Sequence, residues 1–99
     1  MVLVNIIKTY RNIVAICDKE LLGKKFEDEK FQLEIKESFY KGKEVNEKEL
    51  VEIMKDWSME DATFNIVGKK AISIALKTGL INQEGVKEIQ GVPFALVLL

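Results

Sequence analysis

The chain has 99 residues, 47% of them hydrophobic and 31% charged, and a formal net charge of −1 at pH 7. These values predict a single domain over residues 1–99 and exclude an intrinsically disordered chain, which needs low hydrophobicity and high net charge. A pI of about 5.5 argues against a protein that binds duplex DNA, because clustered Lys and Arg supply most of that affinity.

The single cysteine and the shortness of the apolar runs indicate where the protein works. One Cys and the lack of a signal-peptide pattern favour a reducing compartment. The longest apolar run, residues 92–99, is too short to cross a bilayer. We therefore expect a cytoplasmic protein that contacts no membrane.

The N-terminal part of the chain has the pattern of β structure. Val2–Thr9 and Ile13–Asp18 are rich in β-branched residues and predict a hairpin. Asp18 is placed to cap a short turn over Lys19–Leu22. Phe31–Ile35 alternates apolar and polar residues, which is the pattern of a strand with one buried face.

Residues 45–57 predict the first long helix. Asn46 is a favourable N-cap and Glu49 follows three positions later, so the two residues can form a capping box. Apolar residues at helical spacing predict the face that packs on the core: Leu50, Ile53, Met54 and Trp57.

Residues 62–81 predict a strand, a corner at Gly68-Lys69-Lys70 and a second long helix. The helix should end where Gly79 adopts positive φ, with Lys77 favourably placed in its last turn. The predicted buried face consists of Ala71, Ile72, Ala75, Leu76 and Leu80.

The chain closes with a short turn and an apolar strand. Asn82 can cap a single turn through Gly85, and Val92–Leu99 then reads as a strand that tolerates Pro93 near its beginning. An unbroken apolar run favours a central strand covered on both faces, or a strand covered by a second subunit. Both alternatives remain open at this point.

Together these elements predict an α+β fold. We expect a mainly antiparallel sheet of about five strands with the two long helices packed on one face, so that each helix buries one stripe. An arrangement with helices on both faces is the alternative.

Residues that could carry chemistry are few. The chain has no His, and Gly68-Lys69-Lys70 departs from the phosphate-binding loop because Thr63 stands where that motif needs Gly. Glu27-Asp28-Glu29 lacks the spacing of a calcium loop, so we expect no metal and no cofactor. Only Cys17, Asp18 and Tyr40 could take part in catalysis, and we favour a non-enzymatic protein.

Several short motifs in combination resemble a known family over nearly the whole chain. They are Cys17-Asp18, Glu20-Leu21-Leu22-Gly23-Lys24, Phe39-Tyr40-x-Gly42, Asn65-Ile66-Val67-Gly68, Gly79-Leu80-Ile81 and Gly91-Val92-Pro93. They resemble the small archaeal family catalogued as domain of unknown function, number 424. The resemblance implies a stand-alone archaeal cytosolic protein without an established activity. It also implies a His after Val-Pro, where this chain has Phe94.

Three corners of the chain combine Gly with Lys and suggest a binding function. In chain order they are Gly23-Lys24-Lys25, Lys41-Gly42-Lys43 and Gly68-Lys69-Lys70. Glycine permits close approach of a backbone and lysine meets phosphate, so we expect a non-enzymatic module that binds RNA or a ribonucleoprotein, as in translation. If the preceding strands end at one sheet edge, the corners lie on one side. The candidate binding residues are Lys24, Lys25, Lys41, Lys43, Lys69 and Lys70.

The alternative hypothesis is a protein-interaction or homodimerising module. It uses the acidic surface of the helix at residues 45–57 and the apolar strand at residues 92–99.

Overall fold

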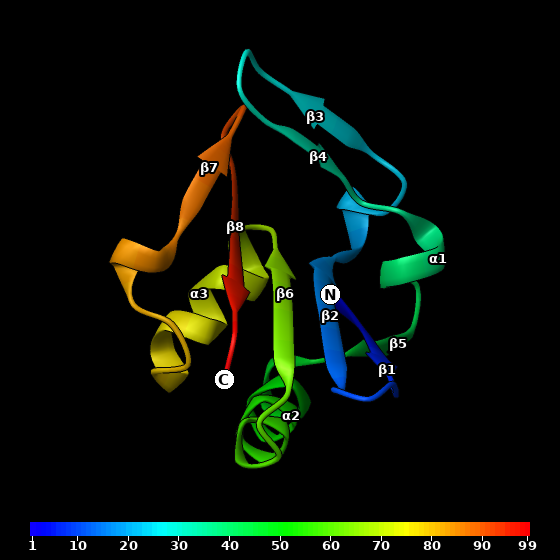
Figure 1. Ribbon diagram of the computed structural model, residues 1–99, viewed down its shortest axis with the longest axis vertical. Coiled ribbons are helices and arrows are strands. Elements are labelled where there is room, and N and C mark those ends of the chain that lie inside the picture. The colour runs from blue at the N-terminus through cyan, green and yellow to red at the C-terminus, as the bar shows by residue number, and fades with distance from the viewer.

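The computed structural model describes residues 1–99, and six strands form its main sheet: β1 (Val2–Ile7), β2 (Ile13–Asp18), β5 (Lys43–Val45), β6 (Thr63–Val67), β7 (Lys87–Ile89) and β8 (Val92–Val97). They lie in the order β5-β1-β2-β6-β8-β7 (Figure 1). Neighbouring strands are antiparallel except β2 and β6, which are parallel.

Two helices, α2 (Glu47–Met59) and α3 (Lys69–Thr78), cover one face of this sheet, behind the strands in Figure 1. Alternate residues of the strands, such as Val14 and Ile16 of β2, point into the layer between sheet and helices, where they are fully buried. Leu50 and Met54 of α2 meet them there, as their helical spacing predicts.

The opposite face is covered by smaller elements. A 3-10 turn, η1 (Lys19–Leu21), leads into a separate hairpin of β3 (Lys25–Glu27) and β4 (Gln32–Glu34), followed by the single-turn helix α1 (Glu37–Tyr40). In Figure 1 the hairpin crosses the upper end of the sheet. At its far side Gln90 Nε2 donates to Glu27 O at 2.6 Å. The hairpin therefore closes over only part of this face.

The α+β fold class and the two main helices on one face are confirmed. The main sheet has six strands rather than about five, because β5 and β7 have three residues each and are too short to show alternation. The alternating segment Phe31–Ile35 does form a strand, but it pairs with β3 outside the main sheet.

Local signals place the ends of the helices. The capping box of α2 is present, with Glu49 N donating to Asn46 Oδ1 at 2.8 Å. Gly79 ends α3 at φ 80°, and Asn82 caps a second 3-10 turn, η2 (Gln83–Gly85). Each of these was predicted from neighbouring residues alone. No helix of the chain is long and apolar enough to span a membrane.

Candidate functional site

The edge of the sheet where β2 and β6 end forms the centre of the candidate site. The parallel pairing ends at Cys17 and Val67, so Asp18, the last residue of β2, lies at the same end of the sheet as Gly68, which follows β6. Helix α3 begins at the next residue, Lys69. The C-terminal ends of parallel strands are where open sheets with helical cover usually bind ligands.

The carboxylate of Asp18 caps α3 from the neighbouring strand. Its two oxygens accept hydrogen bonds from Lys70 N at 3.0 Å and Ala71 N at 2.9 Å, and the residue is only 3% exposed. The expectation that Asp18 caps the turn after it is wrong, because its side chain makes no bond there. A carboxylate of the chain itself therefore occupies the position at which a helix N-terminus attracts anions.

The glycines of two corners are required by close contacts within the chain. Gly68 has φ 111°, and a Cβ at this position would collide with the Asp18 carboxylate. A Cβ at Gly42 would collide with the backbone of Val4, since β5 runs beside β1 there. Both glycines thus allow close approach of the chain to itself, which is a structural role for the glycine of each corner.

The lysines of the third corner line two grooves. The larger has a volume of about 530 Å³ and lies between the beginnings of α2 and α3. The smaller, of about 280 Å³, lies on the side of Asp18 and Pro93. Lys69 and Lys70 contribute to both, and Glu47 contributes the acidic side chain of the larger groove. The two lysines therefore stand between two hollows at one edge of the sheet.

Ion pairs divide the six predicted binding lysines into two groups. Lys25 pairs with Glu27 at 3.3 Å, and Lys43 pairs with Glu49 at 3.3 Å. The remaining four make no ion pair and are exposed: Lys24, Lys41, Lys69 and Lys70. The charge available to an anionic partner is thus concentrated in these four residues.

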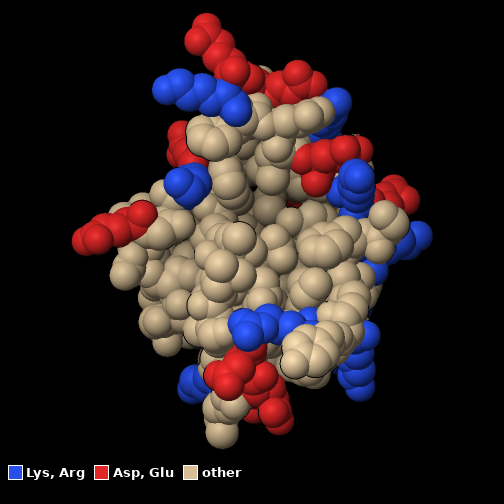
Figure 2. All heavy atoms as spheres, in the orientation of Figure 1, with Lys and Arg blue, Asp and Glu red and all other residues tan.

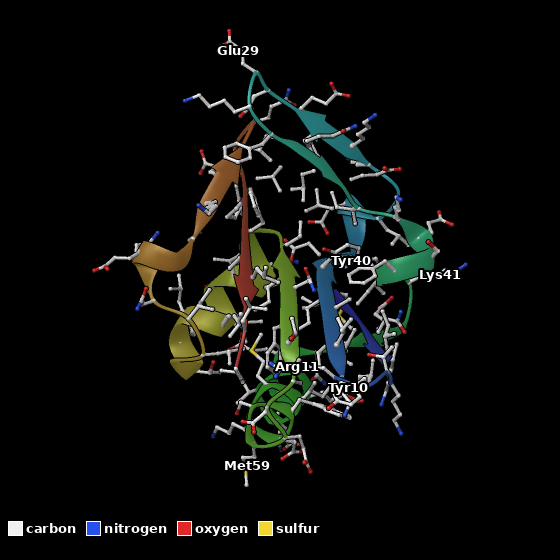
Figure 3. All side chains as sticks on the ribbon, in the orientation of Figure 1. Tyr10, Arg11, Glu29, Tyr40, Lys41 and Met59 are labelled. Atoms are coloured by element: carbon white, nitrogen blue, oxygen red, sulfur yellow. The ribbon has the colours of Figure 1, made fainter.

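The structure places only two of the three corners after neighbouring strands of the main sheet. Asp18, beside Gly68, is joined to the first corner at Gly23 by the short η1 turn, so the first and third corners follow neighbouring parallel strands. The second corner begins at Lys41, whose N–H donates to Glu37 O at 2.9 Å at the end of α1, and Figure 3 shows its side chain pointing outward. The strand before it, β4, lies outside the main sheet, so the expected meeting of strand ends involves only the first and third corners.

The three candidate catalytic side chains are engaged or buried. Burial, followed by the nearby charges of Asp18 and Glu20, raises the pKa of the Cys17 thiol to about 12. Burial also raises the pKa of Tyr40 to about 12, and its ring packs edge-on against Phe39. A thiol with this pKa is protonated at neutral pH and is a poor nucleophile. No group of three His, Cys, Asp or Glu residues could hold a metal ion.

Comparison with known proteins places the chain in a family. The family described as "Protein of unknown function (DUF424)" matches residues 7–99. The chain belongs to the DUF424 family. A solved structure titled "Crystal structure of an uncharacterized conserved protein from Methanopyrus kandleri" is similar to this DUF424 chain, with a TM-score of 0.83 and 28% identity over 97% of this chain and 89% of that one. Among proteins of curated function, none matches.

A second surface of this DUF424 protein lies along the terminal strand, for which the sequence left two alternatives open. Leu96 and Leu98 of the terminal strand segment are 59% and 70% exposed, so β8 is not covered on both faces within one chain. Figure 2 shows the side away from the helices, where the centre carries no charged side chains. The apolar run at residues 92–99 indicated this surface. Which of its residues the β3-β4 hairpin leaves uncovered could not be predicted from the sequence.

Proposed function

We propose that the protein is a non-enzymatic module that binds RNA or a ribonucleoprotein, in a role associated with translation. One observation carries the proposal: Lys24, Lys41, Lys69 and Lys70 are exposed and make no ion pair, and two of them lie between the grooves at the edge where β2 and β6 end. Phosphate oxygens are acceptors that lysine binds without regard to sequence.

The position of these lysines favours single strands and loops over duplexes. An RNA strand laid across the groove of about 530 Å³ would place its phosphates at Lys69 and Lys70, with apolar lining from Val2 and Ile74 beneath its sugars and bases. Sequence-tolerant binding of single strands combines positive grooves with apolar contact in this way. Because Asp18 already caps α3, the lysine side chains and not the helix N-terminus would meet the phosphates.

The test compares two quadruple variants with equal charge. One replaces Lys24, Lys41, Lys69 and Lys70 with Ala; the control replaces four other exposed lysines without ion pairs, Lys8, Lys30, Lys55 and Lys87. Binding to fluorescent single-stranded RNA is measured by anisotropy over a salt series. The first variant should lower the slope of log K against log salt by up to about 2.8, since each single-strand phosphate contact contributes about 0.7.

The control should keep the wild-type slope, because none of its lysines lines either groove of the candidate site. Equal losses of RNA affinity in both variants would mean that only the net charge of the protein determines binding. No affinity of the wild-type protein for RNA at low salt would end the proposal.

A second candidate function is a protein-interaction module, favoured by the exposed Leu96 and Leu98. The acidic helix gives weaker support, because Glu47 pairs with Lys77 at 3.6 Å and Glu49 pairs with Lys43. Only Glu52 and Asp56 of that helix face are free of ion pairs and exposed. The terminal strand is thus the stronger candidate interface.

A further inference from the structure

One edge of β8 is open over its second half. β7 pairs only with Val92–Phe94, while β6 pairs along the other side as far as Val97. Gly68 N donates to Pro93 O at 2.9 Å, so the carbonyl group of Pro93 faces β6. By the alternation of antiparallel ladders, Ala95 and Val97 also face β6, whereas the N–H and C=O of Leu96 face the open side.

The chain cannot extend β7 to cover this edge. Continuing the register of β7 would place Gly85 opposite Leu96, but the N–H of Gly85 is bonded to Asn82, the N-cap of η2, to its backbone oxygen at 3.0 Å and to its Oδ1 at 3.1 Å. What remains is a groove of about 300 Å³ beside Leu96–Leu98. Its other lining residues are uncharged: Gly79, Leu80, Ile81, Asn82 and Gly85.

We propose that a second copy of this chain occupies the groove by pairing its β8 antiparallel with β8 of the first. The two-fold axis passes beside Val97, so that Leu96 of each copy exchanges hydrogen bonds with Leu98 of the other. This register satisfies the outward-facing groups of Leu96 in both copies and joins two six-stranded sheets into one of twelve strands. The proposal names a partner for the second candidate function and is independent of the lysine surface.

Side-chain positions make the edge self-complementary. Leu96 and Leu98 lie on the face away from the helices, so this pairing puts four leucines side by side on the exposed face. Val97 points to the helix side, where it packs on the core, and the partner's copy of this side chain would enter the groove beside Leu80 and Ile81.

Charge and position favour a second copy over an unrelated strand. Residues 91–99 carry no charged side chain, so two copies of the edge do not repel each other. Arg11 Nη1 donates to Leu99 O at 2.7 Å and holds the end of the segment in place. The edge is thus neutral, apolar and held in position before it meets its partner.

Cross-linking tests the register. In the proposed pair, Val97 faces itself across the two-fold axis as a non-hydrogen-bonded pair, with Cα atoms roughly 4.5 Å apart, a separation that a disulfide can bridge. Val97→Cys should therefore form a disulfide-linked dimer under oxidising conditions. Leu96→Cys is the matched control and should not, because its diagonal partner lies roughly 7–8 Å away. The native Cys17 is fully buried and does not compete.

The mass in solution tests the pairing itself. Wild-type protein should show the dimer mass by light scattering, with dissociation only on dilution. Leu96→Pro removes an N–H that has no partner within the chain, so the fold should persist, by circular dichroism, while the mass falls to that of a monomer.

Three results would overturn the proposal: a wild-type monomer at all concentrations, a folded Leu96→Pro dimer, or equal cross-linking of Val97→Cys and Leu96→Cys. None of them bears on RNA binding, which depends on the lysines.

Discussion

The two faces of the main sheet differ in how completely they are covered. On the helix side, α2 and α3 close over one cluster of 15 buried residues, whereas the hairpin, η1 and α1 bury a cluster of only 6 on the other side. A long helix presents a continuous apolar stripe, but strands of three residues cannot. Stability is therefore concentrated on the helix side, and the exposed leucines lie where the cover stops.

The largest expected effect contrasts matched phenylalanines from the two sides. Phe64 on β6 is fully buried beneath the helices, whereas Phe31 beside the hairpin is 52% exposed. Phe64→Ala should lower the free energy of unfolding by about 3–5 kcal/mol, because it removes contacts and leaves a cavity. Phe31→Ala should change it by less than about 1 kcal/mol. Urea denaturation of both variants measures the contrast, and similar losses would show that both sides contribute equally.

A smaller effect is expected at Asp18, which ties the edge of β2 to the helix layer. Asp18→Ala leaves the N–H groups of Lys70 and Ala71 without acceptors and should lower the free energy of unfolding by about 2–3 kcal/mol. Glu20→Ala, two residues further on and exposed, is the matched control and should stay within about 0.5 kcal/mol. If the two variants unfold at the same denaturant concentration, the cap does not stabilise α3.

The smallest expected effect on stability concerns the thiol of Cys17, which is buried on the hairpin side of the sheet. The pKa of Cys17 is raised from 9.0 to about 12 in the folded chain, so above pH 9 the unfolded chain loses the proton first. The resulting stabilisation is complete below pH 9 and is lost as pH rises toward 12, by up to about 1.4 kcal/mol per pH unit. Wild type should therefore lose more stability than Cys17→Ala between pH 8.5 and pH 10.5, by about 1–2 kcal/mol in urea denaturation.

Parallel pH dependence of the two proteins would show that the hairpin does not keep water from the thiol. Tyr40 is present in both proteins, and burial, the main cause that raises its pKa, is common to the two.

The local sequence was sufficient to predict a structural feature wherever the contact that determines it lies within one helical turn. Asn46 and Glu49 are three residues apart, and Gly79 ends α3 through its own backbone freedom, so both ends were predicted correctly. Most of the buried stripes of α2 and α3 follow from helical spacing, but Ile74 of α3 is buried without having been predicted. For the candidate site, the sequence indicated the lysines and the apolar terminal strand.

Contacts between residues far apart in the sequence could be identified only in the structure. Asp18 caps α3 by accepting a hydrogen bond from an N–H that lies 52 residues away, and no spacing in the sequence signals such a bond. The pairing of β2 with β6 and the ion pairs that leave four lysines free are likewise decided between segments. The open edge of β8 exists because β7 begins only after η2 and pairs no further than Phe94, so it is a product of the whole arrangement and not of β8 alone. Interactions between residues close in sequence determined where the helices and strands form. Packing between distant segments determined which of their surfaces remain exposed for binding.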